Sequence, residues 1–269
     1  MDNEQAKKII KDTVAKSIKD FAKKSISKKA KFQILDLIIP KERKIRSIVG
    51  GLETSLGTTL WEPLAKALAK ENGFIVVKEK LKCPSNMPVT LSNTLQGIIE
   101  DRKKGAGLYD ASSSHREIKR ICQPLINRPI DSFEKPPKGR GVDIWLQKDG
   151  VDYFFDTKTV QPNLSALTSC LEQVLSWYAF YYSNNPKGQA EGRIVFPYNP
   201  YVDINFWGKV IGNGKPLEQL KEAWVENEFW DFCSGLNNTY GIITTAFNEL
   251  AQAGTLERDL DTLLKTNSK

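Results

Sequence analysis

The chain has 269 residues, of which 40% are apolar and 10% aromatic, so it is long enough to bury a substantial core. Its formal net charge of +7 and isoelectric point of about 9.1 favour a polyanionic partner. A single histidine excludes histidine-based zinc sites and most catalytic triads, and four widely spaced cysteines exclude a zinc ribbon or a dense disulfide framework. The sequence contains no signal-peptide core and no apolar run of about eighteen residues, which predicts a soluble, cytoplasmic protein without a membrane segment.

The first 72 residues are predicted to be helical. Apolar residues recur at helical spacing between positions 3 and 24, with lysines on the other faces. Gly50 and Gly51 are expected to interrupt the helical pattern. A new helix is expected to begin near Thr54 or Thr58 and to end at 71–73.

The next stretch predicts a short strand at 74–77 and two helices at about 91–103 and 113–126, the second capped by a serine of the run 112–114. Four basic or titratable side chains share one broad face of the second helix: His115, Arg116, Lys119 and Arg120. This face could lie along DNA phosphates or enter the major groove. A charged, solvated surface explains it equally well.

Two runs rich in Val, Ile, Trp, Tyr and Phe flank Asp149-Gly150, which predicts a hairpin with a two-residue turn. If Lys148 pairs with Val151, the same register places Asp143 opposite Asp156, with Lys158 two residues further along the same face. Like charges so close destabilise a sheet unless they are neutralised. A magnesium ion, which prefers carboxylate, water and phosphate oxygens, would neutralise them. The alternative is that Asp156 and Lys158 are ordinary charges on a solvent-facing strand.

Polar residues on either side of the hairpin are candidates for DNA contact. The loop 135–141 is basic and rich in proline and glycine, and its Lys138 and Arg140 could hold a phosphate. After the hairpin, the side-chain amides of Gln161 and Asn163 could read base edges. A strand-to-helix turn would explain Asn163 without a DNA contact, but it would not explain Gln161.

The remaining sequence predicts a helix from Asn163 to about Tyr182 and a strand at 193–196, which together with the hairpin form a right-handed crossover. A strand at 206–211 and helices near 216–235 and 240–265 follow. The predicted fold is therefore mixed α/β, with a central mixed sheet flanked by helices and a helical N-terminal portion.

Asp143, followed after twelve residues by Asp156-Thr157-Lys158, resembles the motif of the PD-(D/E)XK nuclease superfamily, with Val142 in place of its nominal proline. Three longer strings are similar to the TdeIII-type group of type II restriction endonucleases: FFDTKTVQPN at 154–163, FPYNP at 196–200 and SLGTTLWE at 55–62. The resemblance implies one restriction-endonuclease-like domain over 1–269, with a helical portion at 1–72 and a catalytic core at 73–269.

The resemblance also implies an activity: magnesium-dependent hydrolysis of double-stranded DNA by a homodimer at a short, palindromic, GGNCC-like site. Asp143, Asp156 and the main-chain carbonyl of Thr157 would hold the metal, and Lys158 would position or deprotonate the attacking water. Glu62 would supply a further acid, with Glu53 in reserve. Two alternatives remain: a nuclease of repair, recombination or transposition without strict sequence specificity, and a DNA-binding protein without catalysis.

Overall fold

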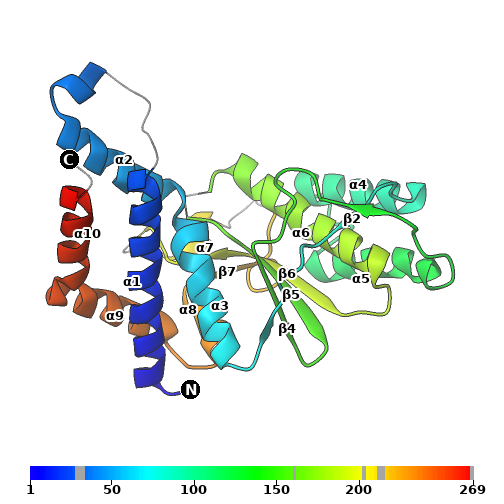
Figure 1. The fold of residues 1–269 in the computed structure, drawn as a ribbon. Coiled ribbons are helices and arrows are strands. Elements are labelled where there is room, and N and C mark those ends of the chain that lie inside the picture. Colours follow the sequence, from blue (N-terminus) through cyan, green and yellow to red (C-terminus); the bar gives the residue numbers. More distant parts are fainter. Residues whose placement is uncertain (28–33, 160–161, 202–203, 211–215, 267–269) are drawn as a thin grey trace. The chain divides into compact units, whose positions relative to one another are not determined.

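A computed structural model describes residues 1–269 except 28–33, 160–161, 202–203, 211–215 and 267–269 (Figure 1). The chain divides into two compact units, one formed by residues 1–72 and 230–269 and the other by residues 73–229. The single nuclease domain expected from the sequence stays a prediction. In the described part of the chain, no helix is both long and apolar enough to cross a membrane.

The first unit is helical. From its N-terminal part come α1 (Asn3–Ser27), the short η1 (Ile34–Leu37), α2 (Pro40–Thr54), η2 (Gly57–Trp61) and α3 (Glu62–Glu71). From its C-terminal part come α9 (Thr239–Ala253) and α10 (Thr255–Thr266), while α8 (Asn227–Ser234) spans the boundary between the units. The apolar face of α1 is buried at Ala6, Ile10 and Val14, which confirms the helix predicted for 3–24.

The predicted interruption at Gly50 and Gly51 is wrong, because α2 continues through both residues. Proline is favourable in the first turn of a helix, where its missing N–H costs nothing, and Pro40 begins α2. Gly51 lies close to the ring of Phe21 in α1, and a Cβ at that position would come within 3.2 Å of the ring. The absence of a side chain at Gly51 therefore allows α2 to pack closely against α1.

The second unit is built on a five-stranded mixed sheet in the order β1-β4-β5-β6-β7. The strands are β1 (Ile75–Val76), β4 (Ile144–Lys148), β5 (Val151–Thr157), β6 (Ala190–Phe196) and β7 (Ala223–Val225). The β1–β4 and β4–β5 pairs are antiparallel, and the β5–β6 and β6–β7 pairs are parallel. A separate two-stranded sheet joins β2 (Cys83–Pro84) to β3 (Phe133–Glu134). The predicted mixed α/β fold is confirmed.

The β4–β5 hairpin has the predicted turn and the predicted register. Asp149 and Gly150 both have positive φ, at 51° and 78°, as a two-residue type I′ turn requires. Lys148 pairs with Val151, and the ladder continues to Ile144 opposite Phe155. This register fixes which β5 side chains face the helix that follows.

That helix is α6 (Leu164–Asn184), which crosses over from β5 to the parallel β6. It packs with α4 (Val89–Lys104) and α5 (Ala111–Cys122) over the sheet of the second unit (Figure 1). The short η3 (Gln123–Ile126) extends α5. The cap of α5 was mispredicted: Asp110 accepts the amide hydrogen of Ser113 at 2.6 Å, and the hydroxyl of Ser113 in turn accepts from the Asp110 amide.

Two elements near the end of this unit differ from prediction. The segment predicted as a strand at 206–211 forms α7 (Phe206–Val210) in its described part, because Asn205 accepts a hydrogen bond from the Gly208 amide and so begins a helical turn. The predicted helix at 216–235 contains β7, whose Trp224 and Val225 pair with β6. The sequence of this segment did not reveal β7, because its strand conformation comes from pairing with β6 and not from the local propensity of its residues.

Candidate active site

Asp156 and Lys158 form the centre of the candidate site on β5 and just beyond its end. Their side chains form an ion pair of 2.6 Å between the Lys158 Nζ and one carboxylate oxygen of Asp156. Burial disfavours the charged form of Lys158 and so lowers its pKa. The nearby carboxylates, mainly Asp156 and to a smaller extent Asp143, favour the charged form. Their combined attraction exceeds the effect of burial, so the pKa of the ammonium is raised. Lys158 is therefore a protonated, positively charged donor at neutral pH.

The position of Asp143 corrects one detail of the predicted geometry. The β4–β5 ladder ends at Ile144 and Phe155, and the Asp143 amide donates to the Phe155 carbonyl at 3.0 Å. Asp143 therefore lies in a bend one residue short of the ladder pair with Asp156 that the register predicted. Its carboxylate nevertheless favours the charged form of Lys158. That Asp143 and Asp156 share one face stays a prediction.

Helix α6 completes the surroundings of Asp156. The side-chain amide of Gln173 donates to the second carboxylate oxygen of Asp156 at 2.5 Å and to the Gly141 carbonyl at 3.0 Å. Asp156 is only 7% exposed, so these partners replace the water that burial removes. Cys170 lies on the same helix, and burial raises its thiol pKa to about 11, so it remains a neutral thiol.

Arg140, predicted to hold a phosphate, is engaged within the protein. Its guanidinium pairs with Glu172 on α6 and donates to the Ser169 carbonyl at 3.0 Å. Glu172 also pairs with Lys103 on α4. Burial raises the pKa of the Glu172 carboxyl, but these two cations outweigh burial and the pKa is lowered. Glu172 and Gln173, adjacent on α6, therefore both have specific partners.

The other predicted DNA contacts near the hairpin have different surroundings. Lys138 is exposed in a turn and makes no ion pair among the described residues. The side-chain oxygen of Asn163 caps α6 by accepting from the Ala166 amide at 2.8 Å, which matches the turn interpretation. Gln161 lies outside the described residues.

The four predicted contacts on α5 do not form one open face. His115 stacks on the ring of Tyr178 and bonds to the hydroxyl of Tyr182 at 2.8 Å. Lys119 donates to the Gly188 carbonyl at 2.9 Å. Arg120 pairs with Glu117 on its own helix, and Arg116 is exposed without an ion pair among the described residues. His115, Arg116 and Lys119 line a pocket instead, whereas Arg120 does not.

Glu62 and Glu53 lie in the helical unit. Glu62 begins α3, and one of its carboxylate oxygens pairs with Lys66 at 3.0 Å. Its other oxygen is buried and has no hydrogen-bond partner among the described residues. Glu53 is exposed near the end of α2. Thr157 follows Asp156 on β5, and strand alternation turns its side chain to the opposite face, so only its main-chain carbonyl could join the site.

The donor chemistry suits magnesium better than zinc. Carboxylate and carbonyl oxygens are typical magnesium ligands, whereas zinc prefers nitrogen and sulfur, and Cys170 is held as a neutral thiol. Among the residues that the structure describes, no group of three or more histidine, cysteine or carboxylate side chains gathers around one point. A metal at Asp156 would depend on water and phosphate oxygens for its remaining ligands.

Comparison with known proteins covers nearly the whole chain. A family model described as "Type II restriction endonuclease, HinfI" matches residues 2–251. The type II restriction enzyme MjaII of Methanocaldococcus jannaschii is 22% identical over 211 residues, which is 75% of this chain. The chain spans about half the length of that relative, 54%. These matches confirm the predicted similarity to type II restriction endonucleases of the PD-(D/E)XK superfamily, and the matching family model is that of HinfI.

Proposed function

The chain belongs to the HinfI family of type II restriction endonucleases, and from this premise we propose that it hydrolyses double-stranded DNA at a short, symmetric site in a magnesium-dependent reaction. One observation carries the proposal: a buried carboxylate, Asp156, lies between the ammonium of Lys158 and the amide of Gln173. Phosphodiester hydrolysis needs charge stabilisation around a phosphate and an oriented water, and this group of side chains can contribute to both.

Lys158 supplies positive charge beside the scissile phosphate. Because its pKa is raised, the side chain is a donor in the resting protein, and it orients the attacking water or stabilises negative charge on the phosphate. It could act as a base only after its attraction to Asp156 is weakened. Gln173 binds one oxygen of the Asp156 carboxylate and Lys158 binds the other.

Asp143, Asp156 and the Thr157 carbonyl would hold magnesium. A bound magnesium ion would supply Lewis-acid stabilisation of phosphate oxygens and lower the pKa of bound water. Glu62 lies in the helical unit, where one of its carboxylate oxygens is buried without a hydrogen-bond partner among the described residues, and its role as a metal ligand stays a prediction. Exposed Glu53 remains the reserve.

Base reading and phosphate contact are assigned to residues flanking this site. Exposed Lys138 is the best candidate for a phosphate contact near the catalytic residues, because Arg140 is already paired with Glu172. Gln161 and Asn163 would read base edges, although Asn163 also caps α6. A homodimer would match a palindromic site by its two-fold symmetry. A GGNCC-like sequence is the first site to test.

The decisive experiment incubates the protein with a sequenced plasmid in magnesium and maps the ends. Discrete fragments with common ends would support site-specific cleavage. A continuous smear would instead indicate a nuclease of the same superfamily without strict specificity. Intact plasmid under all magnesium conditions would contradict catalysis and leave a DNA-binding protein.

Matched variants link the activity to the proposed residues. Asp156→Asn and Lys158→Met should each reduce cleavage at least about a hundredfold, because each removes charge at the phosphate. Asp152→Asn is the control, since Asp152 is a buried carboxylate on the same strand and face that bonds to Tyr181 at 2.7 Å and Trp145 at 2.6 Å. Its loss should lower stability and leave the rate of the folded protein nearly unchanged.

A further inference from the structure

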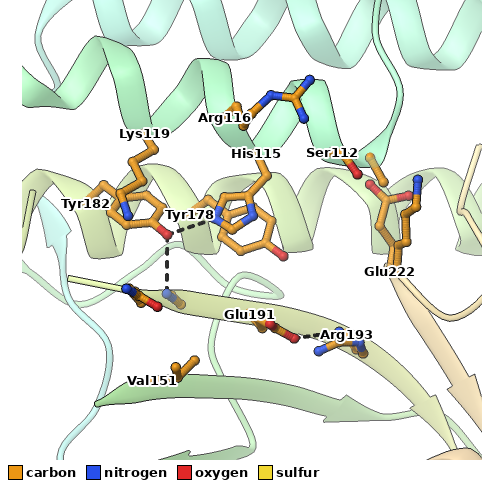
Figure 2. A pocket seen from close by; sticks show the side chains of 14 residues that line it. Ser112, His115, Arg116, Lys119, Val151, Tyr178, Tyr182, Glu191, Arg193 and Glu222 are labelled. Atoms are coloured by element: carbon orange, nitrogen blue, oxygen red, sulfur yellow. Dashed lines mark hydrogen bonds and ion pairs between the residues drawn. The ribbon is translucent and has the colours of Figure 1, made fainter. Parts of the chain in front are cut away.

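A polar cavity of about 390 Å³ lies in the sheet unit, and neither Asp143 nor Asp156 lines it (Figure 2). Helices α5 and α6 form one side, and the start of β6 and the segment before β7 form the other. Val151, at the start of β5, lies at its base, five residues before Asp156. The lining extends along β6 to Arg193, which pairs with Phe155 on β5, but it includes neither Asp156 nor Lys158.

Positive charge dominates the lining of this cavity. Four cationic side chains line it, Arg116, Lys119, Arg193 and Lys221, against the two carboxylates of Glu191 and Glu222. Glu222 does not offset them, because it forms a bidentate pair with buried Arg102, at 2.9 and 2.6 Å. Arg193 pairs with Glu191 at 2.6 Å, and Lys221 forms a solvent-exposed and therefore weak pair with Glu218 at 3.2 Å. The excess of positive charge that attracts an anion comes mainly from Arg116 and Lys119.

Two of the cations have hydrogen-bonding capacity that no described partner uses. Arg116 is exposed at the rim and makes no ion pair among the described residues. Arg193 is held by Glu191 at 2.6 Å and lies over the ring of Trp224, yet one of its terminal nitrogens is buried and has no partner in the described structure. A buried donor without an acceptor calls for an ion or water beside it.

Aromatic side chains of α5 and α6 line the side of the cavity opposite β6. The hydroxyls of Tyr178 and Tyr182 accept from the β6 amides of Gly192 and Ala190, at 2.9 and 3.2 Å, on the edge of β6 that β7 does not cover. His115 stacks on Tyr178 with ring centroids 4.0 Å apart (Figure 2). These planar groups form an aromatic surface beside the cations, suited to the flat base or sugar of a nucleotide.

We propose that this cavity binds the phosphate of a nucleotide, with Arg116 and Lys221 as the principal contacts and the His115–Tyr178 stack beside the attached nucleoside. Its volume falls within the range of small-ligand sites, so it accommodates more than a bare phosphate. The phosphate has two possible sources, a free nucleotide or a DNA strand that extends beyond the cleavage site. The proposal does not depend on cleavage.

The only histidine of the sequence provides a direct test, because His115 gives a single imidazole NMR signal inside the cavity. The protein labelled at histidine is titrated, in EDTA and at constant ionic strength, with pyrophosphate, with dAMP and with a short DNA duplex. The same titrations are made on Arg116→Gln and Lys221→Gln. Arg120→Gln is the matched control, because Arg120 is an exposed cation on α5 that lies outside the cavity.

The expected result is a saturable shift of the His115 signal, with affinity about tenfold weaker in Arg116→Gln and Lys221→Gln and unchanged in Arg120→Gln. A shift with pyrophosphate or dAMP would identify a free-nucleotide site, and a shift with the duplex alone would identify a DNA-strand phosphate. The proposal fails if no probe shifts the signal, or if Arg116→Gln and Arg120→Gln weaken binding equally. Because no cleavage is measured, either outcome leaves the proposed nuclease activity untouched.

Discussion

The side-chain amide of Gln173 donates a hydrogen bond of 2.5 Å to the carboxylate of Asp156. The same amide nitrogen lies 3.0 Å from the Gly141 carbonyl, so one side chain of α6 holds both the β5 carboxylate and the loop before β4. Lys158 holds the other carboxylate oxygen at 2.6 Å. Gln173 on α6 thus orients the Asp156 carboxylate, and a phosphate would approach this carboxylate from the side of Lys158.

Replacement of Gln173 by methionine should reduce both activity and stability. The change keeps side-chain volume but removes the donor from a carboxylate that is only 7% exposed. We expect a loss of about 1–3 kcal/mol in the free energy of unfolding, because a buried acceptor is left unpaired. Cleavage should fall about 10–100-fold as Asp156 loses its orientation. Denaturant unfolding and single-turnover cleavage measure the two effects.

Gln147→Met is the matched control for that variant. Gln147 on β4 also offers its amide to a buried carboxylate, that of Asp152, but at 3.4 Å and away from Asp156. It should change cleavage by less than about threefold, well inside 1 kcal/mol. Equal losses of activity in the two variants would show that Gln173 acts only through general stability.

Lys138→Ala should weaken DNA binding without destabilising the fold. Lys138 is exposed and makes no ion pair among the described residues, so its removal breaks no internal contact. If it contacts one phosphate, the slope of log affinity against log salt concentration should fall by about one. Fluorescence anisotropy with a labelled duplex at several salt concentrations, in calcium or EDTA to prevent cleavage, measures the slope. An unchanged slope would remove Lys138 from the interface.

Arg140→Met should lower the stability of the fold and leave DNA binding largely unchanged, the reverse of the result expected for Lys138→Ala. Because Arg140 pairs with Glu172 and bonds to the Ser169 carbonyl, its loss should lower thermal stability, and Glu172→Gln should lower it similarly. The two changes together should cost less than the sum of the separate losses, as expected for a direct pair. A large drop in DNA affinity for Arg140→Met with full stability would instead restore the phosphate contact predicted from the sequence.

The hairpin was predictable because its determinants are local. Asp149-Gly150 permits the two positive φ angles of the turn, and the turn length fixes the pairing of Lys148 with Val151. The same counting failed at Asp143, where the strand has already ended and the Asp143 amide bonds to the Phe155 carbonyl. A register count assumes a regular strand, and sequence does not show where the ladder stops.

The parts of the site that sequence missed depend on long-range contacts. Gln173 meets Asp156 only because α6 crosses back over β5, and Arg140 meets Glu172 for the same reason. The charged face predicted on α5 was separated by tertiary packing, since His115 and Lys119 turn toward α6 and β6 whereas Arg120 pairs along its own helix. Helical periodicity predicts which side chains lie on the same face of a helix, but it does not predict which other parts of the protein that face will contact.

Arg102→Met should be among the most destabilising single changes in the sheet unit. Arg102 on α4 is buried, pairs bidentately with Glu222 before β7, and donates to the Pro216 carbonyl at 2.7 Å. Its removal leaves the Glu222 carboxylate buried without its counter-charge, which costs about 3–5 kcal/mol. Denaturant unfolding measures the loss. Pairing Arg102→Met with Glu222→Leu should recover much of it, and failure to recover would show that the cost comes from packing instead.

His115 should make the folded protein less stable in mild acid. Burial, aided by nearby Lys119, lowers the pKa of the imidazole to about 4. The unfolded chain takes up this proton near pH 6.5 and the folded chain only near pH 4, so stability is lost as pH falls through this interval. The lost contribution should be roughly 2–3 kcal/mol and should be absent in His115→Gln. Unfolding free energies at several pH values, compared between the two proteins, measure the difference, and an imidazole NMR signal that titrates near pH 6.5 would contradict the burial that lowers the pKa.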